Sequence, residues 1–263
     1  MEAIYRAGGA LSFAMTLPDD RARTKSGRVY IDDFCVKNGI PLLKSSHVNN
    51  PDVIEAIKAA KLDWLFIIGW SQIASEELLN SPLRGVMGMH PTLLPEGRGR
   101  AAIPWAILKD LTKTGVTLFK MDAGVDTGPI AAQIEIPLSP ETTATHLYDQ
   151  VDAAHIKLID QVIPIINSDK LTLREQDHSQ ATLWPGRKPE DGRINFAGSV
   201  HEAEKLVRAV THPYPGAFYD IGNTRHIVWA AEISSDGDAA DGPHLNFTDG
   251  ILRIKDESQA FLT

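Results

Sequence analysis

Apolar positions fall into short runs that alternate with amphipathic stretches as far as residue 167. Residues 64–69 form a continuous apolar run typical of a buried parallel strand, and residues 84–90 and 115–121 contain further strands. Residues 51–61 and 143–167 carry apolar side chains at helical spacing. This alternation predicts an α/β fold: a Rossmann-like, mostly parallel sheet with flanking helices.

Two local signals refine this reading. Asn50 precedes Pro51 and is predicted to cap the helix that follows. Residues 18–28 are charged and polar, with a proline and a glycine, and predict a loop.

The pattern changes after residue 167, where short segments are separated by proline- and glycine-rich turns. A helix is predicted at residues 200–210, and the apolar segments after it are typical of short strands. We therefore expect a catalytic domain over residues 1–170, a linker over 171–200 and a small β-rich domain over 201–263. Residues 1–9 indicate the end of a helix rather than an opening strand, so the first strand of the domain is expected to be missing.

Composition limits which partners the protein can bind and in which cell compartment it is expected. The net charge of −8 and the absence of a basic run disfavour a nucleic-acid partner. Cys35 is the single cysteine, so no internal disulfide forms, and no metal-ligand spacing is present; we expect no bound metal. No apolar run reaches the length of about 18 residues that a membrane span needs, and no signal peptide is evident, which favours a cytoplasmic protein.

The first segment with candidate chemistry is GMHPTLLPEGRGRAAIPWAI, residues 88–107. His90 follows a predicted strand directly and precedes Pro91, which keeps its backbone extended. A histidine at the carboxyl end of such a strand is expected to face the ligand crevice; the alternative is a histidine bound to a backbone carbonyl. Arg98 and Arg100 could bind a phosphate or lie in a solvated loop.

The second segment is KMDAGVDTGPI, residues 120–130. Asp126 lies between two glycines, where the backbone can approach a ligand closely. If its carboxylate meets His90, it can fix the imidazole tautomer. Asp122 is interpreted as a turn residue with a solvated carboxylate. No dinucleotide fingerprint, P-loop or nucleophile elbow is present.

Together the two segments resemble the histidine loop and the aspartate loop of the folate-dependent formyltransferases, in order and in spacing. The similarity extends over nearly the whole chain, including NPDVIEAIKAAKLDWLFIIGWSQIASEELLNSP before the first segment. The resemblance implies a Rossmann-like sheet followed by a small β domain. It also implies N10-formyltetrahydrofolate as the co-substrate that donates the formyl group.

The resemblance assigns roles to particular residues. His90 and Asp126 correspond to the catalytic pair. The pterin is expected between the loop after residues 64–69 and the aspartate loop, which nominates Trp70, Gln72, Ile73, Val125 and Asp126. For Trp70 and Ile73, simple core packing is the alternative. One position departs from the family: its catalytic asparagine, two residues before the histidine, is Gly88 here.

The region from Arg208 to Trp229 is most similar to nucleotide-sugar formyltransferases such as the UDP-4-amino-4-deoxy-arabinose enzyme. This predicts a small-molecule amine acceptor on a nucleotide sugar, with Arg98, Arg100 or Arg208 meeting its diphosphate. The alternatives are initiator methionyl-tRNA as acceptor and, because of Gly88, a formyl-folate hydrolase or an impaired folate-binding homologue. Glycinamide ribonucleotide is disfavoured, since that enzyme normally lacks the β domain. A homodimer is expected only by analogy.

Overall fold

The computed structural model of the protein describes residues 1–22, 29–70, 72–234 and 242–261. The chain forms two compact units that interleave along the sequence. Unit 1 comprises Met1–Arg100, Thr114–Ile136 and Val151–Trp184, and unit 2 comprises Ala101–Lys113, Pro137–Gln150 and Pro185–Thr263.

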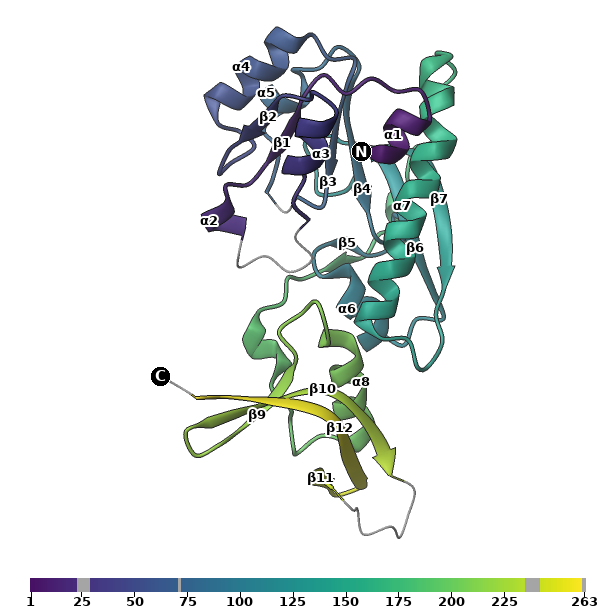
Figure 1. The fold of residues 1–263 in the computed structure, drawn as a ribbon. Helices are drawn as coiled ribbons and strands as arrows, with labels where there is room; N and C mark the ends of the chain where they lie inside the picture. Colours follow the sequence, from purple (N-terminus) through teal and green to yellow (C-terminus); the bar gives the residue numbers. More distant parts are fainter. Residues whose placement is uncertain (23–28, 71, 235–241, 262–263) are drawn as a thin grey trace. The chain divides into compact units, whose positions relative to one another are not determined.

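The main sheet of unit 1 has the strand order β3-β4-β6-β7 (Figure 1). Strand β3 (Trp64–Ile68) pairs in parallel with β4 (Gly85–His90), whereas β4 pairs antiparallel with β6 (Lys113–Lys120). Strand β7 (Ile130–Pro137) follows β6. All six residues of β4 are buried, which is consistent with its central position in the sheet.

Two smaller strand pairs belong to the same unit. Strand β1 (Ala14–Thr16) pairs in parallel with β2 (Leu42–Lys44), and β5 (Arg98–Gly99) pairs in parallel with β8 (Leu183–Trp184). The second pair joins the segment after His90 to residues that lie 85 positions further along the chain.

Helices α4 and α5 cover the β3–β4 part of the sheet through one apolar cluster. Val53, Ile54 and Ile57 of α4 and Leu78 of α5 are buried there. The helices of the described chain from the amino terminus to residue 180 are α1 (Glu2–Arg6), α2 (Asp19–Ala22), α3 (Asp32–Lys37), α4 (Pro51–Ala60), α5 (Glu76–Leu79), α6 (Ala102–Leu108), α7 (Ala144–Asn167) and the 3-10 turn η1 (His178–Gln180).

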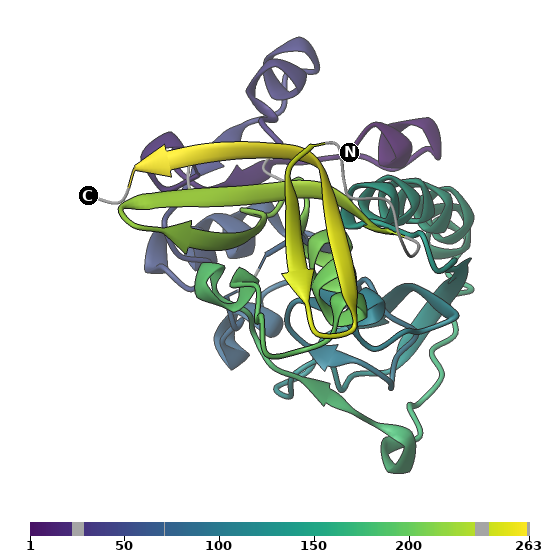
Figure 2. The same cartoon turned by 90° about the horizontal axis from the view of Figure 1, so that it is seen from below.

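Unit 2 contains an antiparallel sheet with the order β11-β12-β10-β9. Helix α8 (Val200–Val210) packs against β10 and β12, as Figure 2 shows from below. The Ser199 hydroxyl accepts from the Glu202 N–H while the Glu202 carboxylate accepts from the Ser199 N–H, so this helix starts with a capping box. The other elements are η2 (Pro189–Gly192), β9 (Ala217–Ile221), β10 (Thr224–Ser234), β11 (His244–Phe247) and β12 (Gly250–Phe261).

The predicted fold class is confirmed: a mixed α/β sheet with flanking helices is followed by a β-rich part. The apolar side predicted for α7 is buried: Leu147, Val151, Ala154, Leu158 and Val162. The antiparallel pairing of β4 with β6 was not foreseen, because alternation along a sequence does not report the direction of a strand.

Two local predictions need correction. Asn50 is the N-cap residue of α4 and Pro51 its first residue, as predicted, but the Asn50 side chain makes no capping hydrogen bond; its amide donates to the Ser45 hydroxyl at 3.0 Å instead. In the predicted loop at residues 18–28, Asp19–Ala22 form helix α2, with two aspartates in its first turn, where a helix favours negative charge. Residues 23–28 lie outside the described part of the chain.

Among the described residues, no helix is both long enough and apolar enough to cross a membrane.

Truncation of a core side chain in α7 tests the packing of unit 1. Leu158 is fully buried, whereas Ile165 on the same helix is 40% exposed. We expect Leu158→Ala to lower the free energy of unfolding by about 2–5 kcal/mol, because it leaves a cavity. Ile165→Ala should change it by no more than about 0.5 kcal/mol. Urea denaturation of both variants measures the difference, and equal losses would contradict this packing.

Candidate active site

His90 is the last residue of β4, and its imidazole is buried, with 8% of the residue exposed. Its Nε2 lies 2.7 Å from the backbone oxygen of Gly97, in the loop that follows the strand. A carbonyl oxygen can only accept a hydrogen bond, so Nε2 carries the proton. The Gly97 carbonyl therefore fixes the tautomer, and Nδ1 is the nitrogen left for other chemistry.

The Asp126 carboxylate faces that nitrogen. Its Oδ2 lies 3.7 Å from His90 Nδ1, and the same oxygen accepts a hydrogen bond from the Gly99 N–H at 2.8 Å. The structure thus brings His90 and Asp126 together, as expected if the carboxylate is to act on the imidazole. Asp126 has a positive φ of 53°, a conformation that aspartate tolerates better than most residues.

The loop carrying Asp126 reaches His90 by folding back along β4. Because β4 and β6 are antiparallel, Lys120 at the end of β6 pairs with Met87, three residues before His90. The segment 121–129 then returns toward the carboxyl end of β4. Within it, Asp122 accepts from the Gly124 N–H at 3.0 Å and from the Thr127 hydroxyl at 2.6 Å, which makes it a turn residue.

Gly88 occupies the position of the family's asparagine, and its space is already filled. Gly88 pairs with Phe119 across the strands, and a Cβ at Gly88 would lie 3.0 Å from both the Phe119 ring and the Met121 side chain. Phe119 packs with Leu94 and Ile130 in a small apolar cluster. A group that stabilises charge beside His90 must therefore come from elsewhere than position 88.

Sequence reasoning missed Gln176, whose side chain binds the backbone of the aspartate loop. Its Nε2 donates to the backbone oxygens of Asp126 at 2.9 Å and of Gly128 at 2.7 Å. The Arg98 guanidinium donates to the Gln176 Oε1. The only signal in the sequence was a polar cluster, Arg-Glu-Gln-Asp at residues 174–177, with no periodic pattern around it.

Arg98 is buried, with 8% exposure, and its Nη2 also lies 3.0 Å from His178 Nδ1. His178 begins the turn η1, where the Ser179 hydroxyl and N–H hold the pKa of Asp177 below its ordinary value. A contact between Arg98 and an acceptor phosphate stays a prediction.

The four residues predicted to meet the pterin, besides Asp126, differ in their surroundings. Gln72 binds the protein itself: its Nε2 donates to the Ser46 oxygen, and its Oε1 accepts from the Val48 N–H and from Trp70 Nε1. Trp70 is half-buried and packs against the apolar cluster beneath α4 and α5. By contrast, Ile73 is 76% exposed and Val125 is 49% exposed.

The other two predicted arginines lie in different units. Arg100 is exposed in unit 1. Arg208 belongs to unit 2, where its Nε donates to Glu204 at 2.7 Å and its Nη1 donates to the Thr142 oxygen at 3.0 Å. Their contact with a substrate stays a prediction.

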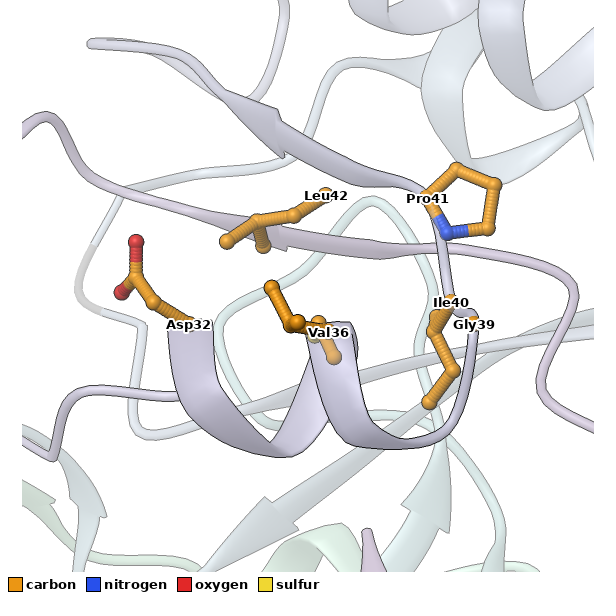
Figure 3. Close-up of a pocket in the computed structure, with 7 residues that line it drawn as sticks. Asp32, Val36, Gly39, Ile40, Pro41 and Leu42 are labelled. Atoms are coloured by element: carbon orange, nitrogen blue, oxygen red, sulfur yellow. The ribbon is translucent and has the colours of Figure 1, made fainter.

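Two surface hollows of unit 1 lie apart from these groups. One, of about 400 Å³, lies between α3 and β2 and is lined by apolar side chains such as Val36, Ile40 and Leu42 (Figure 3). The other, of about 440 Å³, lies between Glu76, Arg84 and Asp122. Neither contains His90 or Asp126.

The sequence matches two family descriptions along its length. The family described as "Formyl transferase" matches residues 15–163, and "Formyl transferase, C-terminal domain" matches residues 187–262. The chain therefore belongs to the formyl transferase family, and it is an enzyme of that class.

Solved structures with the same fold include three formyl-transfer or folate-binding proteins. Methionyl-tRNA formyltransferase from Clostridium thermocellum has a TM-score of 0.66 at 19% identity, covering 96% of this chain and 100% of that one. HypX from Aquifex aeolicus, in complex with tetrahydrofolic acid, has a TM-score of 0.67 at 16% identity, covering 93% and 43%. WlaRD, a sugar 3N-formyl transferase in the presence of dTDP and 5-N-formyl-THF, has a TM-score of 0.64 at 19% identity, covering 92% and 87%. This chain thus spans less than half of the HypX chain.

The packing around Gly88 leads to a stability prediction. We expect Gly88→Ala to lower the free energy of unfolding by about 1–3 kcal/mol, because the added methyl group overpacks the Phe119 ring. Phe119→Leu should relieve that contact, so the double variant should lose less than the sum of the two single losses. Chemical denaturation of all three variants measures this coupling; strictly additive losses would show that Phe119 does not fill the position.

Proposed function

We propose that this protein transfers a formyl group from N10-formyltetrahydrofolate to the amine of a nucleotide-linked amino sugar. The observation that carries the proposal is the His90–Asp126 pair, held at 3.7 Å between Nδ1 and Oδ2. The imidazole is buried and its tautomer is set by Gly97, so the reactive nitrogen is presented in one orientation.

In the proposed reaction, the acceptor amine attacks the formyl carbon of the donor, and the carbonyl oxygen becomes an oxyanion. His90 Nδ1, the imidazole nitrogen that Gly97 does not bind, accepts the proton of the attacking amine, and the imidazolium formed, paired with Asp126, stabilises the oxyanion by its charge. When the carbonyl re-forms and the bond between the formyl carbon and N10 breaks, His90 passes this proton to N10, the leaving nitrogen. General acid–base help of this kind contributes about 10²–10⁴-fold to the rate.

The donor site is proposed from the two loops that follow β3 and β6. Ile73 and Val125 are large apolar side chains left exposed there, and an exposed apolar surface favours contact with a flat aromatic ring such as a pterin. The amide of Gln72 holds Trp70 and the segment at residues 46–48, so we assign it to shaping this site rather than to a direct contact.

For the acceptor, a nucleotide sugar is favoured over methionyl-tRNA by the net charge of −8. The similarity to the sugar 3N-formyl transferase also supports a sugar, although a methionyl-tRNA formyltransferase shares the fold. Arg100 is exposed beside β5 and is proposed to meet the diphosphate; Arg98 and Arg208 remain further candidates.

Substitution of the pair tests the catalytic assignment. His90→Ala and Asp126→Asn should each lower turnover by about 10²–10⁴-fold, because each removes part of the proton-transfer group. In His90→Ala, binding of N10-formyltetrahydrofolate, followed by calorimetry, should change by no more than about threefold. His201→Ala, an exposed histidine on α8, is the matched control. Wild-type turnover in His90→Ala would end the proposal.

The acceptor is tested by incubating the protein and N10-formyltetrahydrofolate with UDP-4-amino-4-deoxy-arabinose, other amino-sugar nucleotides, or methionyl-tRNA. Mass spectrometry should detect a formylated sugar nucleotide. Formate without a formylated amine would instead identify a hydrolase, the alternative that Gly88 favours. Raising salt from 50 to 200 mM should weaken acceptor binding only modestly; a loss of about 10³-fold or more would indicate tRNA.

A further inference from the structure

We infer that Arg98 and Gln176 form a positioning pair that sets the Asp126 carboxylate toward His90. The inference rests on the proposed catalytic role of Asp126. Arg98, named above as a further candidate for the diphosphate, is buried and donates to Gln176, and Gln176 acts through the backbone of the aspartate loop.

The contacts that carry the inference form one continuous chain inside unit 1. Arg98 Nε and Nη2 donate to the Gln176 Oε1 at 3.2 and 2.6 Å. This uses the amide oxygen and turns the amide nitrogen toward the loop. That nitrogen donates to the backbone oxygens of Asp126 and Gly128 at 2.9 and 2.7 Å. Gln176 is 4% exposed, so water does not compete for these bonds.

The loop needs such a restraint because of its backbone. Asp126 has φ of 53°, a left-handed conformation that costs free energy in a residue with a side chain. Gln176 holds the carbonyl of this residue and a second carbonyl two residues later. With these two points fixed, the carboxylate lies where the Gly99 N–H and His90 Nδ1 both face it.

Arg98 contributes to both sides of this arrangement. Its side chain orients Gln176, while its backbone belongs to β5, which pairs with β8; the Arg98 N–H donates to the oxygen of Thr182, the residue before β8. The next residue, Gly99, supplies the N–H that binds Asp126. A shift of Arg98 would therefore disturb both contacts that position the Asp126 carboxylate: the bonds from Gln176 to the loop and the bond from the Gly99 N–H.

A second arginine–glutamine pair provides a matched control. Arg174 donates to the Gln133 Oε1 at 2.9 Å, and Gln133 Nε2 donates to the Leu94 oxygen and to the Thr117 hydroxyl, each at 2.9 Å. The chemistry is the same, but this pair holds Leu94 rather than the aspartate loop. Equivalent substitutions at Gln133 therefore report the general cost of breaking such a network.

The first test needs no substrate. Gln176→Glu keeps the acceptor for Arg98 and loses both donations, and Gln176→Met loses all contacts at similar length. Amide exchange of the ¹⁵N-labelled protein should accelerate at Gly99 by about tenfold or more in both variants, because its acceptor is no longer held in place. The Arg98 and Arg100 amides, bound to Thr182 and Trp184, should change by less than about threefold. Wild-type exchange at Gly99 in both variants would overturn the inference.

The second test links position to rate. Activity is measured with N10-formyltetrahydrofolate and UDP-4-amino-4-deoxy-arabinose, or as formate release if no sugar is formylated. Gln176→Met should lower kcat by about 10–100-fold, because a small misplacement of the Asp126 carboxylate costs about that much in rate. The KM for the folate should change little. In an Asp126→Asn background the same substitution should have no further effect on kcat. Gln133→Met should lower the melting temperature comparably and leave kcat within about threefold.

The outcomes separate the two proposals. Additive losses in the double variant, or an equal loss of kcat in Gln133→Met, would mean that Gln176 acts only on stability. Full activity in His90→Ala and Asp126→Asn would remove the catalytic role of the pair, whereas the exchange at Gly99 would still report whether Gln176 holds the carboxylate.

Discussion

The antiparallel pairing of β4 with β6 is the constraint on which the arrangement around His90 depends. It places the end of β6 beside Met87, so the following loop must run back along β4 before Asp126 can face the imidazole. In that loop Gln176 binds the carbonyls of Asp126 and Gly128, and the Gly99 N–H binds the Asp126 carboxylate. Hydrogen bonds from outside the loop therefore fix its backbone where it forms no strand.

The same strand pairing explains why position 88 has no room for a side chain. Gly88 and Phe119 lie opposite each other, and the aromatic ring takes the volume that a side chain on β4 would occupy. His90, two residues further along β4, is itself buried, and its two nitrogens meet a carbonyl and a carboxylate. Burial of the imidazole strengthens the electrostatic interaction of the pair, because it keeps the local dielectric constant low.

The elements with strong periodicity were predictable from sequence. The apolar run that became β3 and the buried side of α7 required only the spacing of side chains, and His90 and Asp126 stood out by their glycine- and proline-rich loops. The two-residue strands β5 and β8 were not predictable, because their pairing joins residues 85 positions apart and leaves no local pattern. The role of Gln176 was not predictable for a related reason: a glutamine that binds backbone oxygens has no preferred neighbours in sequence. The tautomer of His90 depends on where the Gly97 carbonyl points, which only coordinates reveal.

The interleaving of the two units has a consequence for how such a chain can be altered by evolution or in the laboratory. Unit 2 takes in residues 101–113 and 137–150 as well as everything after Trp184. A single recombination crossover near residue 185 would therefore exchange only part of that unit, and it would leave two inherited segments beside foreign neighbours. Exchange between homologues should succeed only when those inner segments travel with the carboxyl-terminal part.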